Sequence, residues 1–457
     1  MKMNKILAAL CVAGLATPQF ANATNGMLME GYGPIATGMG GASMAYDNGN
    51  AGMANNPATL GLMADGGRLD VAVGGLHPDV VAKMTGMPDA TSGGTAYYMP
   101  AMGWTTKKNG LAYGVGMFAQ GGMGTEYKST DWVGAGSGLS SRSEVGVGNL
   151  IIPVAYEVSP ELTVAGSLDF VWSSMDLQMA MPASQMGAMA GAGLITASGA
   201  AAAALPGFLG GLNNVGYFNF SDNSAFTGAA KSTGFAGKLG MTYKLNKQLT
   251  LGATYHAKTA VGDMTSNSGK MSMIDNANAL GAGAGVTHTL NGKITVVNFQ
   301  FPETYGLGAA YQATDELMVA ADWKRVGWKS VMKDFRMKFS STDMGGLDMT
   351  MTMPQNWKDQ DVIQLGAAYK LSTALTVRAG ANLASNPVPN DTVNPLFPAT
   401  VENHFTMGAG YAIDTASSIN GSFVYAPKVT VTAPAASGGY KIDHGQMNWQ
   451  LMYSRSL

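Results

Sequence analysis

The chain has 457 residues, of which only 12% are charged, and its formal net charge is −2. This weakly acidic balance excludes a nucleic-acid-binding protein, which needs a basic surface. The charged share is about half the usual one, and together with 62 Gly and 33 Met it is atypical of a soluble globular domain.

The first predicted element is an export signal. Lys2 and Lys5 precede an apolar run, and Ala-Asn-Ala follows at residues 21–23. This pattern is typical of a secretory signal peptide over residues 1–23, because the run is shorter than the ~20 apolar residues that span a bilayer. The single cysteine, Cys11, lies inside it, so we expect no disulfide and no cysteine-bound metal after cleavage.

Residues 24–65 are rich in Gly, Ala and Met and contain the tripeptide Asn56, Pro57 and Ala58. Pro57 has no backbone N–H and favours an extended conformation in the residue before it. From these residues alone, the simplest interpretation is a turn that precedes the first strand.

From residue 66 onward, apolar and polar residues alternate. Val164 and Phe170, for example, fall on one face of a strand, and Thr163 and Asp169 fall on the other. Because successive side chains of a strand point to opposite faces, each such segment has one apolar and one polar face.

The alternation defines fourteen predicted strands. They lie near residues 66–77, 95–106, 110–124, 144–158, 161–177, 231–245, 248–263, 293–312, 315–339, 359–371, 374–386, 402–413, 417–431 and 443–454. Tight turns alternate with long connections, and an even strand number with that asymmetry indicates a membrane barrel. We therefore predict an all-β fold, in which residues 66–457 form a 14-stranded antiparallel transmembrane β-barrel.

The longest connection, 178–230, is mostly apolar although it is expected on the outside. The candidate docking residues in this segment are Leu194, Ile195, Leu205 and Phe208. An exposed apolar segment often marks an interaction site, so we expect either a docking surface for lipid-like substrates or a cap over the barrel mouth.

Several longer stretches resemble one family. They are "NNPATL" at 55–60, "FPETYGLGAAYQATDELMVAADWKRVGW" at 301–328, "NWKDQDVIQLGAAYKLSTALTVRAGA" at 356–381 and "NPVPNDTVNPLFPATVENHFTMGAGYAI" at 386–413. Together they resemble the FadL family of bacterial outer-membrane transporters for long-chain fatty acids and other hydrophobic compounds. The resemblance implies passive uptake through a barrel whose lumen is closed by an N-terminal hatch, here residues 24–65.

The resemblance also implies a lateral exit for the cargo. Asn56, Pro57 and Ala58 would lie inside the barrel and touch the wall where one strand bends inward. We place that bend at Gln120, Gly121 and Gly122, because Gly within a strand often marks a bulge. The alternative is that these glycines only relieve crowding in the wall.

A fatty acid would need a basic partner for its carboxylate. The resemblance implies a basic residue at the outward end of the fifth strand, but this chain has Asp176 there and no Lys or Arg nearby, which weakens the fatty-acid assignment. The remaining candidates are Lys324, Lys329, Arg336 and Arg378. Each is more often a solvated charge than a ligand contact.

Other functions have weaker support. The five histidines are scattered, no nucleophile motif or cofactor fingerprint is present, and no metal-ligand spacing occurs, so we expect no enzyme, metal or cofactor. A general diffusion porin for small solutes remains the alternative. The expected partners are a hydrophobic ligand, outer-membrane lipid and lipopolysaccharide, and no nucleic acid. We expect the protein to be a monomer.

Overall fold

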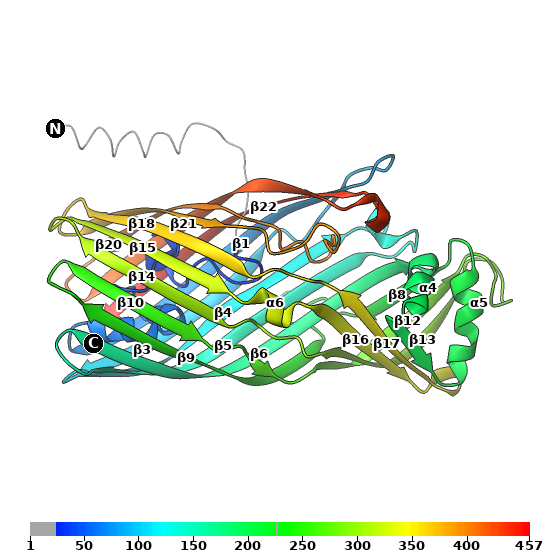
Figure 1. Ribbon diagram of the computed structural model, residues 1–457, viewed down its shortest axis with the longest axis horizontal. Helices are drawn as coiled ribbons and strands as arrows, with labels where there is room; N and C mark the ends of the chain where they lie inside the picture. Colours follow the sequence, from blue (N-terminus) through cyan, green and yellow to red (C-terminus); the bar gives the residue numbers. More distant parts are fainter. Residues whose placement is uncertain (1–23, 225–226) are drawn as a thin grey trace.

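The computed structural model describes residues 24–224 and 227–457, so the predicted signal peptide lies outside the described residues. Antiparallel strands form a closed elongated barrel (Figure 1), in which each strand pairs with the next and the last pairs with the first. In ring order they are β1 (Gly66–Lys83), β3 (Tyr97–Lys108), β4 (Leu111–Tyr127), β5 (Ser141–Glu157), β6 (Leu162–Pro182), β9 (Ala230–Lys244), β10 (Leu249–His256), β14 (Thr304–Gln312), β15 (Leu317–Val326), β18 (Gln360–Lys370), β19 (Leu375–Ala384), β20 (His404–Ala412), β21 (Ser417–Thr432) and β22 (Lys441–Ser456).

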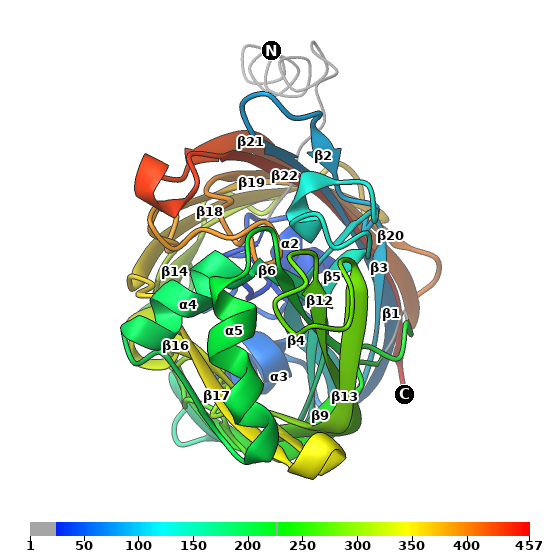
Figure 2. The same ribbon diagram turned by 90° about the vertical axis from the view of Figure 1, so that its right-hand side faces the viewer.

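Further strands extend the wall at the end that carries the long loops. There β6 pairs with β8 (Val215–Phe220), and from β8 each strand pairs with the next in the order β12 (Met264–Asp275), β13 (Val286–Val297), β16 (Asp334–Ser341), β17 (Leu347–Pro354) and β7 (Ile195–Ser198). Two short strands, β2 (Ala90–Thr91) and β11 (Ala260–Val261), pair with β1 and β9. The helices at this end are α4 (Ala183–Gly191), η3 (Ala200–Ala204) and α5 (Leu205–Gly210), and α6 (Trp328–Val331) lies about midway along the barrel (Figure 1). Single turns form η2 (Trp132–Gly134), η4 (Asp343–Gly345) and η5 (Ala435–Ser437). Viewed from this end, α4 and α5 lie across the mouth of the barrel (Figure 2).

The expected count of fourteen strands is wrong, because the sheet formed by the described residues contains 22 strands, of which the ring given above is only a part. The predicted segments 293–312 and 315–339 each hold two strands, so the fourteen segments contain sixteen strands of eight residues or more. The first segment is interrupted where Asn298 has a φ of 53° and Pro302 lacks an N–H. The second is interrupted by α6, and β7, β8, β12 and β17 lie in stretches where the sequence indicated only connections.

Apolar side chains cover the outside of the barrel. On β9, Phe235, Leu239 and Tyr243 are exposed, whereas Lys238 and Thr242 point inward and are buried. This is the reverse of a soluble sheet, and it fits a wall that faces lipid. Among the described residues, no helix combines the length and the apolar character needed to cross a membrane.

The interior at the loop end is filled by an outer methionine cluster. Its members come from β6, from the strands that extend the wall, from α4 and from the residue that follows α6. They are Met175, Met179, Met181, Met186, Met264, Met271, Met273, Met332, Met337, Met349 and Met351. Met is flexible and polarizable, so it can fill an irregular interior where strands and short helices meet.

The N-terminal segment, residues 24–65, lies inside the ring (Figure 2) and contains α2 (Pro34–Thr37), α3 (Gly52–Asn55) and η1 (Pro57–Leu62). It is almost entirely buried, with Met39 and Met53 completely so. The wall carries Gly where this segment approaches: a Cβ on Gly252 would overlap the backbone of Met44, and one on Gly366 would overlap Met39. Gly therefore allows the segment to pack directly on the wall backbone.

Candidate functional site: a cavity that passes through the wall

The Asn-Pro-Ala tripeptide is anchored to β9. The Asn56 Nδ2 atom donates to the carbonyl oxygens of Met44, at 2.7 Å, and of Met241, at 3.2 Å. The Asn56 Oδ1 atom accepts from the backbone N–H of Ala58 at 3.1 Å and so caps η1. A Cβ on Gly240 would overlap Asn56. The side-chain hydrogen bonds of Asn56 therefore reach β9 rather than Gln120–Gly122, while η1 also contacts β4.

A bulge interrupts β4 between Ala119 and Gly121, where its register with β5 shifts. The backbone N–H of Gly122 donates to the Met27 carbonyl at 3.1 Å, and Gly121 forms an antiparallel bridge with Leu28. The Tyr32 hydroxyl donates to the Gln120 carbonyl at 2.7 Å. The bulge is thus held by residues 27–32, which the sequence analysis did not single out, because no local motif marks them.

Strands β3 and β4 separate at this bulge. Their pairing runs from Lys108 and Leu111 to Met102 and Met117 and then stops. Beyond that point β3 continues along β1 as far as Tyr97, and β4 continues along β5 as far as Tyr127. A gap in the wall results, with residues 97–101 on one edge and the bulged part of β4 on the other.

A cavity of about 690 Å³ occupies this gap and the lumen behind it. Its lining includes Tyr98, which is exposed on the outside of the barrel, and Phe118, which is buried inside. Met99, Val147 and Trp172 add apolar surface. Because residues from both faces line one cavity, the cavity passes through the wall.

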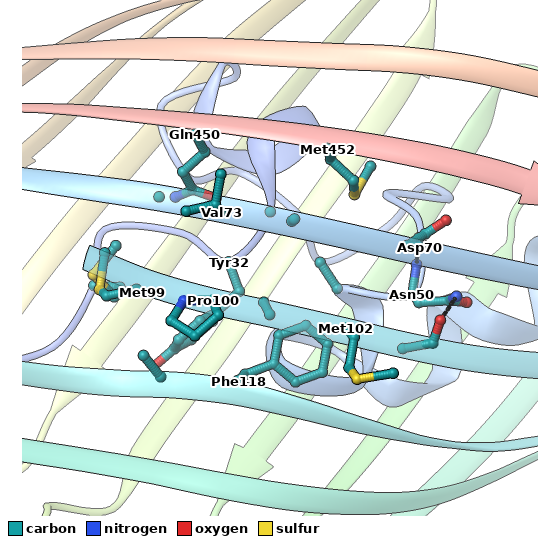
Figure 3. A pocket seen from close by; sticks show the side chains of 18 of the residues that line it. Tyr32, Asn50, Asp70, Val73, Met99, Pro100, Met102, Phe118, Gln450 and Met452 are labelled. Atoms are coloured by element: carbon teal, nitrogen blue, oxygen red, sulfur yellow. Dashed lines mark hydrogen bonds between the residues drawn. The ribbon is translucent and has the colours of Figure 1, made fainter. Parts of the chain in front are cut away.

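A smaller cavity of about 40 Å³ lies beside it and shares Met99, Pro100 and Phe118 with it. Tyr32 and Asn50 of the N-terminal segment line the smaller cavity as well, and Asn50 lies beside Asp70 of β1 (Figure 3). The two cavities therefore connect the bulge, the N-terminal segment and the gap between β3 and β4.

The four candidate carboxylate partners do not come together. Lys324 lines a separate internal cavity of about 40 Å³ with Glu30. Lys329 and Arg336 are exposed, and Arg378 donates to the Asn420 Oδ1 atom at 3.1 Å. The four candidates therefore do not form one basic site, and none of them lines the large cavity.

The large cavity has its own polar residues, Glu144, Lys231 and His444. The sequence analysis missed Lys231, which is exposed near the start of β9. The alternating pattern shows which face of the strand Lys231 lies on, but it does not show which residues of other strands lie beside it. Within the part of the chain that the structure describes, no group of three or more His, Asp and Glu side chains could hold a metal ion.

The four apolar residues of segment 178–230 are not an exposed docking face. Ile195, Leu205 and Phe208 are buried, and Leu194 is half-buried. Because α4 and α5 pack against each other and against the outer methionine cluster, these side chains complete an interior. The expectation that these side chains form an exposed apolar face is therefore wrong, and docking at this segment stays a prediction.

Two wall carboxylates that the sequence analysis missed hold the N-terminal segment. Asp322 accepts from the backbone N–H groups of Ser43, at 2.6 Å, and Met44, at 3.0 Å. Asp70 accepts from the backbone N–H of Asn50 at 2.7 Å. The sequence did hold a signal for these two residues, because both fall on the inward face of a predicted strand. A carboxylate buried there needs a hydrogen-bonding partner.

The apolar exterior, the filled lumen and the cavity through the wall define a membrane channel for hydrophobic compounds. Residues 14–447 match the family described as "Outer membrane protein transport protein (OMPP1/FadL/TodX)", and the chain belongs to this family. The family consists of transport channels and not of enzymes. The expected family, the outer-membrane location and the transport of hydrophobic compounds are thereby confirmed.

Solved structures of similar proteins cover nearly the whole chain. The toluene transporter TodX of P. putida is 31% identical, with 94% of this chain and 99% of that chain covered and a TM-score of 0.83. The toluene transporter TbuX of Ralstonia pickettii is 31% identical over the same shares, with a TM-score of 0.77. A FadL homologue of Pseudomonas aeruginosa, 16% identical with 94% and 99% covered, shares the fold with a TM-score of 0.69.

Curated relatives match over shorter stretches. The 47 kDa outer membrane protein of Pasteurella multocida (strain Pm70) is 27% identical over 194 residues, which are 42% of this chain and 43% of that protein. A Chlorobium limicola protein, described as an uncharacterized protein in the phosphoenolpyruvate carboxykinase gene 5' region, is 49% identical over 82 residues, or 18% of this chain and 39% of that protein. The chain thus spans less than half of the length of either relative.

Proposed function

We propose that the chain takes up small uncharged hydrophobic compounds of the monoaromatic hydrocarbon class and releases them sideways into the bilayer. The observation that carries this proposal is the cavity of about 690 Å³ whose lining runs from buried Phe118 to exposed Tyr98. In this proposal the N-terminal segment acts as a hatch that blocks the direct route along the lumen.

The bilayer is the favourable destination for such a cargo. Each CH₂ group gains about 0.8 kcal/mol when it leaves water, so an apolar compound that reaches the gap moves into lipid without an energy source. A route that ends in lipid also explains why a channel would open through its wall where two strands part.

An uncharged cargo is favoured over a fatty acid. Lys324 and Arg378 contact other parts of the lumen, and neither lines the large cavity. The lysine that does line it, Lys231, is exposed and shares the lining with the acidic Glu144. A buried carboxylate without a basic partner is costly, whereas an aromatic hydrocarbon needs only apolar walls. Two similar structures are described as toluene transporters, which supports the same class.

Cross-linking across the gap tests the exit route. Met99→Cys with Phe118→Cys places one thiol on each edge, and residues 24–457 contain no other cysteine. Closing this pair with a short bismaleimide should abolish uptake of labelled toluene by cells that carry the channel. The matched control is Thr106→Cys with Tyr113→Cys, which joins the same strands where they are already paired.

Uptake that continues after the Met99 and Phe118 positions are cross-linked would refute lateral exit.

Planar-bilayer conductance separates the proposal from the diffusion porin. A hatch-filled channel should pass little ionic current, whereas steady channels of nanosiemens scale would favour the porin.

A further inference from the structure

We propose that Pro100 is a positioning residue that fixes where the pairing of β3 and β4 ends. This inference rests on the proposed lateral exit, since it concerns the edge of the gap through which cargo would leave. Pro100 lines both cavities and lies in β3, two residues beyond Met102, the last residue that pairs with β4.

The hairpin between β3 and β4 sets which backbone groups point toward β4. Asn109 and Gly110 form a two-residue turn with φ values of 53° and 80°, and Lys108 pairs with Leu111 across it. In such a hairpin the residues that flank the turn exchange both of their hydrogen bonds, and every second residue then does the same. Lys108 and Met102 therefore both direct N–H and C=O groups toward β4.

Pro100 is the next residue in that series. With the register continued, its partner would be Ala119, because Met102 pairs with Met117. Pro has no N–H, so one of the two bonds of that pair cannot form. The pairing of β3 with β4 thus ends where the donor is missing, and the bulge of β4 begins at the residue that would have been its partner.

Pairing on the other side of β3 is intact. Pro100 lies opposite Val73 in the ladder with β1, and that ladder continues to Tyr97. The alternation directs the groups of Pro100 away from β1, so the missing donor affects only the β4 side.

The membrane gives a physical reason for Pro at this edge. A backbone N–H without a partner costs several kcal/mol in hydrocarbon, so an open strand edge is disfavoured there. Pro100 is exposed on the outside of the barrel and presents no N–H at the gap. On the opposite edge, Gly122 meets this requirement by donating to the Met27 carbonyl.

A second wall proline shows that Pro alone does not open the barrel. Pro153 lies within β5, and the pairing of β4 with β5 resumes on both sides of it, at Tyr113 with Val154 and at Gly116 with Ile151. At Pro100, by contrast, the partner strand bends away at the same level. Pro153 is therefore a matched control, and it lines neither of the two cavities.

The experiment restores the missing donor. Pro100→Val and Pro100→Ala should extend the ladder by one pair and lower the rate of toluene uptake roughly fivefold, as expected for one added hydrogen bond. Hydrogen exchange of the Ala119 amide should slow.

Two further variants serve as controls. Pro153→Val should leave uptake unchanged. Met102→Pro, which ends the ladder one pair earlier, should admit bulkier aromatic compounds. Heat-modifiable gel mobility identifies the variants that have folded, and Pro100→Ala adds the donor with little bulk if Pro100→Val does not insert.

The outcomes separate this inference from the proposed function. Uptake and Ala119 exchange that match the wild type in folded Pro100→Ala would refute the role of Pro100, as would an equal loss in Pro153→Val. If cross-linking Met99→Cys to Phe118→Cys still blocks uptake in that case, lateral exit stands without Pro100. If the cross-link has no effect, the proposed exit route itself fails.

Discussion

The hydroxyl of Tyr32 donates to the backbone carbonyl of Gln120 at 2.7 Å. This bond joins the N-terminal segment to the bulge of β4, 88 residues further along the chain. The bulge carries a carbonyl that the wall ladder leaves free, and Tyr32 is the side chain that satisfies it.

Tyr32→Phe should loosen the bulge without changing the shape of the side chain. Losing one half-buried hydrogen bond costs about 1 kcal/mol, so we expect slower toluene uptake and a lower Tm. Tyr46→Phe is the control, because the Tyr46 hydroxyl bonds to Ala42 within the N-terminal segment itself. Equal uptake in both variants would contradict a role for Tyr32 at the bulge.

Asp322→Ala should release part of the N-terminal segment from the wall. Two backbone N–H groups, of Ser43 and Met44, lose a charged acceptor, and such bonds are worth about 1.5–3 kcal/mol each. We expect higher planar-bilayer conductance and faster proteolysis of residues 24–65. The control is Asp361→Ala, an exposed carboxylate that pairs with Arg325 outside the lumen. A conductance unchanged from wild type would show that Asp322 does not retain the segment.

Asn56→Ala and Gly121→Ala should act independently on stability. Asn56 bonds to Met44 and Met241, whereas Gly121 lies against Met27. Because they share no partner, the double variant should lose the sum of the two changes in unfolding free energy, within about 0.5 kcal/mol. A clearly smaller combined loss would restore the view that the tripeptide and the bulge form one brace.

Phe208→Ala should destabilise the loop end of the barrel rather than weaken capture alone. Phe208 is completely buried, and removing such a side chain typically costs about 3–5 kcal/mol. We expect rapid proteolysis of residues 183–214 together with reduced uptake. Leu212→Ser, at a residue that is 80% exposed, should change neither. Reduced uptake with wild-type protease resistance would instead favour a docking role.

Stability should fall as the pH rises through the titration of Glu30. Burial raises the pKa of this carboxyl group from 4.5 to about 7. Between these values the folded chain binds more protons than the unfolded chain, so the unfolding free energy decreases with increasing pH. Glu30→Gln should remove this decrease and have the higher Tm above pH 7. Parallel Tm profiles for the two proteins would contradict this.

The barrel was predictable because its signal is periodic. The alternation seen at Val164 and Phe170 repeats along each wall strand and depends only on which face meets lipid. The prediction of one strand over 293–312 was wrong because Phe299 and Phe301 continue the alternation past the point where β13 ends.

The site was less predictable because its contacts join distant residues. Asn56 carries a turn signal, but only the folded chain brings it to Met241 rather than to Gln120. Lys231 and Asp322 looked like ordinary polar-face residues, and their neighbours come from other strands. Leu205 and Phe208 looked exposed because the sequence did not reveal how α4 and α5 pack against each other and against the outer methionine cluster.

The outer methionine cluster makes the channel entrance sensitive to oxidants. Its thioethers lie at the end of the barrel that carries the long loops, and oxidation converts each one into a polar sulfoxide. Sulfoxides at Met179, Met271 or Met349 would place strong dipoles among buried apolar side chains. Hypochlorite or peroxide in the surroundings would therefore damage this interior chemically, and the damage would persist until a methionine sulfoxide reductase repaired it or the protein was replaced.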